Sequence, residues 1–140
     1  MPFAHWTLYI LDGDEAVRES ICALAASNGW HHRAFSSAKG FLEQGTILTR
    51  ACLLLDWDLP EIDPVFFLPA LRDHYPGLPV IVMTARDDLS SLSRIEAAGA
   101  SAVLPRPFSF PELSQAVERA LEPLPLHAES DRRADRQSGA

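Results

Sequence analysis

Short apolar runs alternate along the chain with longer segments in which apolar residues recur at helical spacing. The apolar runs are predicted strands, and they cover residues 7–11, 32–35, 51–55, 79–83 and 101–104. The longer segments are predicted helices, and they cover residues 15–28, 64–75, 88–98 and 110–121, with a short helix after Ser36 or Ser37. Pro69 lies inside the helix 64–75 and is expected to kink that helix or cut it in two.

Strands and helices in strict alternation predict a parallel sheet with helices on both of its faces. The predicted fold class is therefore α/β, a doubly wound five-stranded parallel sheet of the flavodoxin-like (βα)5 kind. Residues 1–122 form the predicted domain. After Pro123 the composition changes to charged and small residues, so residues 123–140 are expected to be a disordered tail.

Polar side chains follow four of the predicted strands. Asp12, Asp56 and Thr84 come directly after the first, third and fourth strands, and Arg106 follows the fifth. Because ligands of such sheets gather at the carboxyl ends of the strands, we expect these four side chains to converge at one edge. Two carboxylates there suit a hard divalent cation such as Mg²⁺, and a carboxylate beside a cation can act as a nucleophile toward phosphorus.

Composition and charge narrow the classes of partner. The formal net charge of −7 argues against nucleic acid as the main partner, because a phosphate-binding surface needs clustered basic side chains. No apolar stretch approaches the roughly 18 residues of a membrane-spanning helix and no signal peptide is visible, so we expect a cytoplasmic protein without membrane contact. Cys22 and Cys52 are expected to be buried thiols. Lys39 is the single lysine of the chain.

Four segments carry a resemblance to a known family, over about residues 7–121. LYILDGDEAVRES resembles the first strand and acidic turn of the receiver domains of bacterial two-component response regulators, the CheY-like family. LLLDWDLP resembles the strand that carries their phospho-acceptor aspartate. PVIVMTARDD is similar to the segment of the switch hydroxyl, and AGASAVLPRPF to the late lysine–proline segment. The segments are most similar to receivers of FixJ-type regulators.

The resemblance implies a role for each residue that handles the phosphoryl group. Asp56 would be the phosphorylated residue, and Thr84 would be the hydroxyl that moves toward the phosphoryl group. Arg106 stands where the family has a nearly universal lysine, and its planar fork is not equivalent to a compact ammonium. The family's late cis peptide bond would be Arg106–Pro107. Val103 stands where the family often has an aromatic residue that swings with the hydroxyl, so signal output by that route is not expected.

A Mg²⁺ site is also implied by the resemblance. Asp12 would be the first member of the family's acidic pair, Asp56 would join it, and Asp58 would offer its backbone carbonyl. Gly13 stands where the second acid of the pair is expected, so Mg²⁺ binding is expected to be weak. Asp14 is a further candidate ligand, although it can instead cap the helix that follows.

Three functions stay open on these residues. The first is a single-domain response regulator that receives a phosphoryl group on Asp56 from a histidine kinase or a phosphotransfer protein. It would not be an enzyme beyond self-phosphorylation and slow self-dephosphorylation, and it would signal by contact with an unknown target protein. The alternative is a degenerate receiver that binds partners independently of phosphorylation, with Arg106 paired to Asp56. The third is a small phosphohydrolase. The resemblance further implies a weak homodimer through the face 89–121.

Overall fold

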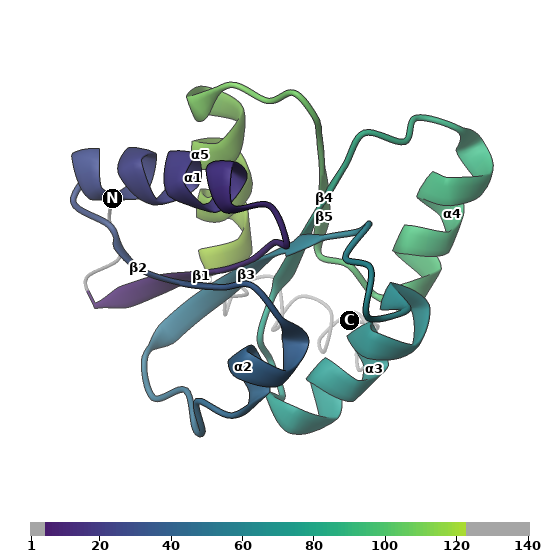
Figure 1. The fold of residues 1–140 in the computed structure, drawn as a ribbon, viewed down its shortest axis with the longest axis horizontal. Coiled ribbons are helices and arrows are strands. Elements are labelled where there is room, and N and C mark those ends of the chain that lie inside the picture. The colour runs from purple at the N-terminus through teal and green to yellow at the C-terminus, as the bar shows by residue number, and fades with distance from the viewer. Residues whose placement is uncertain (1–4, 123–140) are drawn as a thin grey trace, which may run out of the picture.

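Five strands and five helices alternate in the computed structural model, which describes residues 5–122 (Figure 1). The strands are β1 (Trp6–Leu11), β2 (His31–Phe35), β3 (Arg50–Asp56), β4 (Val80–Thr84) and β5 (Ala102–Pro105). The helices are α1 (Glu15–Ser27), α2 (Ala38–Leu42), α3 (Pro64–His74), α4 (Leu89–Ala98) and α5 (Phe110–Leu121). All strand pairs are parallel, and their order is β2-β1-β3-β4-β5. The predicted doubly wound α/β fold is confirmed, while the predicted tail 123–140 lies outside the described residues.

Each face of the sheet is covered by its own set of helices (Figure 1). α1 and α5 pack on one face, where Ile21 and Val117 are buried. α2, α3 and α4 pack on the other face, where Phe41 and Leu71 are buried. Because β3 and β4 are covered from both sides, their sequences are continuous apolar runs. This burial fixes the carboxyl ends of the central strands, and therefore the polar side chains at those ends.

Pro69 does not cut α3 in two, so that part of the prediction is wrong. The helix runs from Pro64 to His74 without a break, and the side chain of Asp63 caps its first turn. Leu71 lies in the buried face of the helix, whereas Pro69 is exposed. Packing of the inner face therefore outweighs the backbone hydrogen bond that a proline cannot donate.

The helices are short. The longest helix within residues 5–122 is α1, with 13 residues, and none in this part of the chain has the length and apolarity to cross a bilayer.

Candidate functional site

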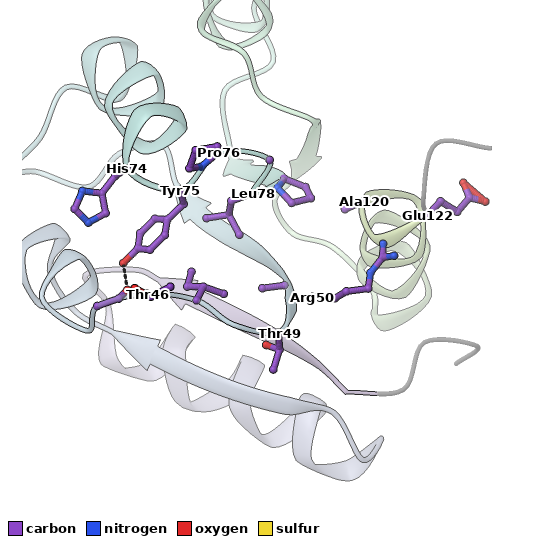
Figure 2. Close-up of a pocket in the computed structure, with 14 residues that line it drawn as sticks. Thr46, Thr49, Arg50, His74, Tyr75, Pro76, Leu78, Ala120 and Glu122 are labelled. Carbon is purple, nitrogen blue, oxygen red and sulfur yellow. Dashed lines mark hydrogen bonds between the residues drawn. The ribbon is translucent and has the colours of Figure 1, made fainter. Parts of the chain in front are cut away.

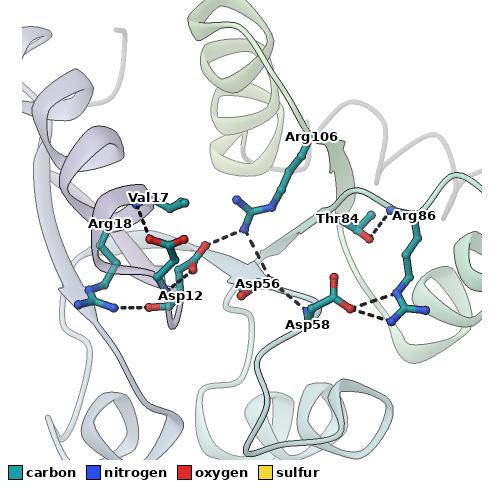
Figure 3. Close-up of polar contacts among 9 residues, drawn as sticks. Asp12, Val17, Arg18, Asp56, Asp58, Thr84, Arg86 and Arg106 are labelled. Carbon is teal, nitrogen blue, oxygen red and sulfur yellow. Dashed lines mark hydrogen bonds and ion pairs between the residues drawn. The ribbon is translucent and has the colours of Figure 1, made fainter.

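Asp12 is the most enclosed acid at the carboxyl edge of the sheet, with 1% of its surface exposed. Its Oδ1 accepts a hydrogen bond from the backbone N–H of Asp14 at 2.8 Å (Figure 3). Its Oδ2 accepts one from Nη2 of Arg106 at 2.7 Å. Both oxygens therefore have a donor, as a buried carboxylate requires.

Arg106 lies between two carboxylates but is held mainly by one of them. Its Nη2 is 2.7 Å from Oδ2 of Asp12 and 3.6 Å from Oδ1 of Asp56. The hypothesis of a degenerate receiver requires an ion pair between Arg106 and Asp56. That pair is present, but it is the longer and weaker of the two. The peptide bond Arg106–Pro107 is cis, as the resemblance implies.

Asp56 closes β3 and is largely buried, with 16% of its side chain exposed. Its Oδ1 accepts a hydrogen bond from the N–H of Asp58 at 2.9 Å, and within residues 5–122 no hydrogen bond reaches its Oδ2. Burial raises the pKa of Asp56, and the nearby carboxylates of Asp12 and Asp58 act in the same direction. The N–H of Asp58 and the guanidinium of Arg106 oppose this shift. Within residues 5–122, one carboxylate oxygen of Asp56 therefore accepts no hydrogen bond, and the negative charge of Asp56 is only partly compensated.

The raised pKa of Asp56 has a consequence for stability. A carboxyl group whose pKa is higher in the folded than in the unfolded chain favours folding at low pH, and this contribution is lost as pH rises through the folded pKa. We therefore expect Asp56→Asn to be more stable than the wild type at pH 7, with a difference that shrinks toward pH ~4. Urea unfolding at both pH values measures it, and a difference that does not change with pH would contradict the assignment.

Thr84 and Arg86 form the third side of the site. Thr84 ends β4 with 1% of its surface exposed, and its Oγ1 accepts a hydrogen bond from the N–H of Arg86 at 3.0 Å. The guanidinium of Arg86 binds Asp58, whose Oδ1 accepts from Nε at 3.1 Å and from Nη2 at 2.9 Å (Figure 3). The Thr84 hydroxyl is thus held near the edge of the site by a backbone donor, and Asp58 is held by an arginine.

Two residues considered from the sequence have other partners. Oδ1 of Asp14 accepts hydrogen bonds from the N–H groups of Ala16 and Val17, so Asp14 is the N-cap of α1, and its proposed role as a metal ligand has no support from this geometry. Lys39 lies on α2, where its Nζ is 4.0 Å from Glu43. It does not reach the acids at the strand ends.

The comparisons with known proteins agree on one family. Residues 8–118 match the model of the response regulator receiver domain. The transcriptional regulatory protein FixJ of Azorhizobium caulinodans is 32% identical over 131 residues, which cover 94% of this chain and 61% of FixJ. The DNA-binding transcriptional regulator NtrC of Proteus hauseri is 32% identical over 114 residues, which cover 81% of this chain and 24% of NtrC. The chain belongs to the response regulator receiver family.

A solved receiver structure has the same fold. The crystal structure of FixJ-N superposes with a TM-score of 0.78 at 30% identity, covering 87% of this chain and 98% of that one. The chain spans less than two thirds of the length of both curated relatives. Receiver domains of two-component systems are signalling modules and not classical enzymes, so membership in the family disfavours the phosphohydrolase alternative.

Receiver domains generally bind Mg²⁺ at the phosphorylation site, but the donors of this receiver do not fit a tight divalent site. Asp12 and Asp56 are the two carboxylates there, and an arginine already occupies Oδ2 of Asp12. Within residues 5–122 no group of three or more His, Cys, Asp or Glu side chains is arranged to hold a metal ion. The backbone carbonyl of Asp58 is the remaining donor that the family pattern implies. The cation site is therefore incomplete at the position of Gly13.

Gly13 is not required by the conformation of the turn. Its φ is not among the positive values, which within residues 5–122 belong to His5 and four other glycines. A Cβ atom placed on it would lie 3.5 Å from Leu59 and 3.8 Å from Pro60, which are ordinary contacts. A side chain at this position would fit, so neither backbone conformation nor space explains why an acid is absent here.

Two arginines of the site were missed by sequence reasoning. Arg86 binds Asp58, and Nη1 of Arg18 donates to the backbone carbonyl of Asp12 at 2.7 Å. Arg86 lies only two residues after Thr84, which is a signal that could have placed it at the site. Nothing in the local sequence indicates that Arg18 turns back from α1 toward β1.

A cavity of about 540 Å³ lies at the opposite edge of the sheet, at the amino ends of β3 and β4 (Figure 2). Arg50, Tyr75 and Glu122 are among its lining residues, and the Tyr75 hydroxyl donates to the carbonyl of Gly45 at 2.9 Å. Because the acids lie at the carboxyl ends of the strands, this cavity is separate from the acidic site around Asp12 and Asp56.

Proposed function

We propose that this receiver accepts a phosphoryl group on Asp56 from a histidine kinase or a phosphotransfer protein and signals through protein–protein contact. The observation that carries the proposal is the position of Asp56 at the end of β3, where its carboxylate is largely buried and lies 3.6 Å from the guanidinium of Arg106. An oxygen of Asp56 would attack phosphorus, and the bond from phosphorus to the donor atom would break, with the electron pair leaving on the donor. Thr84 and Arg106 would then hold the phosphoryl oxygens.

Intact-mass measurement tests this proposal directly. Incubating the full chain with acetyl phosphate and Mg²⁺ is expected to add the mass of one phosphoryl group. Hydroxylamine should then attack the acyl carbon, release inorganic phosphate and leave a hydroxamate on the aspartate, so the mass of the phosphoryl group is lost and that of the hydroxamate appears. Asp56→Asn retains the size of the side chain but lacks a nucleophilic carboxylate, and it should acquire no mass. Equal labelling of the two proteins would place the modification elsewhere, and no labelling of the wild type would contradict the proposal.

A second function, a phosphorylation-independent binding module, is favoured by one observation. The buried ion pair of Arg106 and Asp12 already neutralises the acid that the cation would use. In that case partner binding should be equal for the wild type and Asp56→Asn, with or without acetyl phosphate.

The contact surface is a further proposal. Receiver domains can dimerise, and the face 89–121 on α4, β5 and α5 is our candidate for weak self-association. Leu89 is 80% exposed at the start of that face. Sedimentation of the wild type and Leu89→Ser, before and after phosphorylation, would detect a contribution of this residue.

A further inference from the structure

A second cavity, of about 480 Å³, adjoins the cavity at the amino ends of β3 and β4 that Figure 2 shows. The two cavities share a stretch of lining made by Gly77, Leu78, Pro79 and Ala120. Ser101 and Ala102 extend the lining to the start of β5. The two cavities therefore form one groove along the amino ends of three strands, which we call the amino-edge groove.

The shared part of the groove is apolar and held in place by the fold. Leu78 and Pro79 are half-buried there, and the N–H of Leu78 donates to the carbonyl of Tyr75 at 3.1 Å. Tyr75 is buried, and its hydroxyl bond to the carbonyl of Gly45 ties this wall to the loop before β3. A bound molecule would therefore not have to order this surface, which lowers the cost of binding.

The charged side chains that line the groove are mostly cationic. Arg50 lines the first cavity, and Arg72 and Arg119 line the second. Within residues 5–122, Glu122 is the only acid that lines either cavity. The whole chain has a formal net charge of −7, so this excess of positive charge is local. The groove is therefore complementary to carboxylates carried beside apolar groups.

Two of these arginines differ in how they are held. Nη2 of Arg72 donates to the carbonyl of Ala98 at 2.7 Å, and a Cβ atom on Gly99 would collide with this guanidinium. Arg119 is exposed in the last turn of α5, and among the described residues it has no hydrogen bond or ion pair. The donors of Arg119 can therefore bind a carboxylate without breaking an existing contact.

An extended peptide segment matches the groove better than a small molecule does. The lining cations are spread over both cavities, so one small anion would leave part of the positive charge and of the apolar floor uncovered. An extended segment covers both parts, with apolar side chains on the floor and carboxylates at the exposed arginines of the rim.

We propose that the amino-edge groove binds an extended segment of a partner protein in which acidic residues stand beside apolar ones. The groove lies at the edge of the sheet opposite Asp56, so a bound segment leaves Asp56 accessible to a phosphoryl donor. The inference does not depend on the role of Asp56 as acceptor.

The test measures binding of a labelled peptide to the full chain by fluorescence anisotropy. The probe is a short peptide of leucine, glutamate and proline, in which proline favours an extended backbone. We expect saturable binding that weakens at high salt. The same peptide with glutamine in place of glutamate should bind at least about tenfold more weakly. Arg119→Gln should lose about threefold in affinity, and Arg119→Lys, which keeps the charge, should recover part of the loss.

Arg94→Gln is the matched control. Arg94 is an exposed arginine on α4 that lines a different hollow, beside Asp58. Its replacement removes the same charge from another surface, so Arg94→Gln should bind the peptide as the wild type does. Urea unfolding of Arg119→Gln and Arg94→Gln should agree with that of the wild type, which separates a loss of binding from a loss of fold.

Each other outcome overturns the proposal. Equal binding of the two peptides, or binding of neither, would mean that the groove does not recognise acidic segments. Equal weakening in Arg119→Gln and Arg94→Gln would reduce the effect to the net charge of the protein. Glutarate that displaces the labelled peptide as well as unlabelled peptide does would assign the groove to a small organic anion. Self-association in sedimentation that is lost in Arg119→Gln would assign it to a second copy of this chain.

Discussion

Gly13→Asp is expected to raise the affinity of this receiver for Mg²⁺ by roughly 10- to 100-fold, the range that one added charged ligand supplies. The glycine stands beside Asp12 and its Cβ direction points toward the β3–α3 loop, where Leu59 and Pro60 leave ordinary contact distances. The added carboxylate would bring a third acid to Asp12 and Asp56. Divalent affinity rises with the number of charged oxygen ligands, so the gain comes from charge and geometry together.

Isothermal titration with Mg²⁺ measures this change in affinity. Gly13→Asn is the matched control, because it adds a side chain of the same shape without the charge. We expect Gly13→Asn to bind Mg²⁺ little better than the wild type. An equal gain in both variants would mean that the glycine limits affinity through backbone freedom, and no gain in either would mean that Arg106 continues to exclude the cation.

Arg106→Gln is expected to destabilise the protein by about 2 kcal/mol in the absence of divalent cations. Asp12 is almost fully buried, and removal of Arg106 leaves its Oδ2 without a cationic partner. Breaking a fully buried pair costs more, about 3–5 kcal/mol, but the Arg106 side chain is 24% exposed and water can compensate in part. The neighbouring carboxylate of Asp56 adds to the repulsion that the guanidinium now offsets.

The loss in Arg106→Gln should be reversed by Mg²⁺. Two uncompensated carboxylates, Asp12 and Asp56, then face each other, and a cation that binds the folded state stabilises it by mass action. Urea unfolding in EDTA and in Mg²⁺ measures both effects. Arg18→Gln is a suitable control, since among residues 5–122 Arg18 donates only to the backbone carbonyl of Asp12, and its loss leaves the hydrogen bonds of the Asp12 carboxylate intact. A Mg²⁺ response no larger in Arg106→Gln than in the wild type would exclude competition between Arg106 and the cation.

The two substitutions are not independent. Gly13 and Arg106 both act on Asp12, and neighbouring changes that share a partner rarely add. If the arginine and the cation compete for Asp12, the double variant should bind Mg²⁺ more tightly than either single variant. This comparison separates two effects that are expected to lower the affinity for Mg²⁺, which are the missing acid at position 13 and the competing guanidinium of Arg106.

The sequence by itself determined the fold and the place of the site. Alternating apolar runs and helical patterns are local signals, and the continuous runs in β3 and β4 already indicate strands buried on both faces. Asp12, Asp56 and Thr84 could be placed together because parallel strands end at one edge of a sheet. The position of the cis peptide bond followed from the family motif and is confirmed.

Only the tertiary structure decided which side chains pair. Arg106 lies 94 residues from Asp12 along the chain and was expected to face Asp56, yet its shorter contact is with Asp12. Arg86 and Asp58 are 28 residues apart, and no periodicity links them. Local sequence patterns determine the secondary structure because they act through the conformations of neighbouring residues and through the one face that each element buries. Ion pairs depend instead on the distances between segments that are far apart in sequence, and differences of less than one ångström decide which partner is preferred. These distances are set only once the whole sheet is packed.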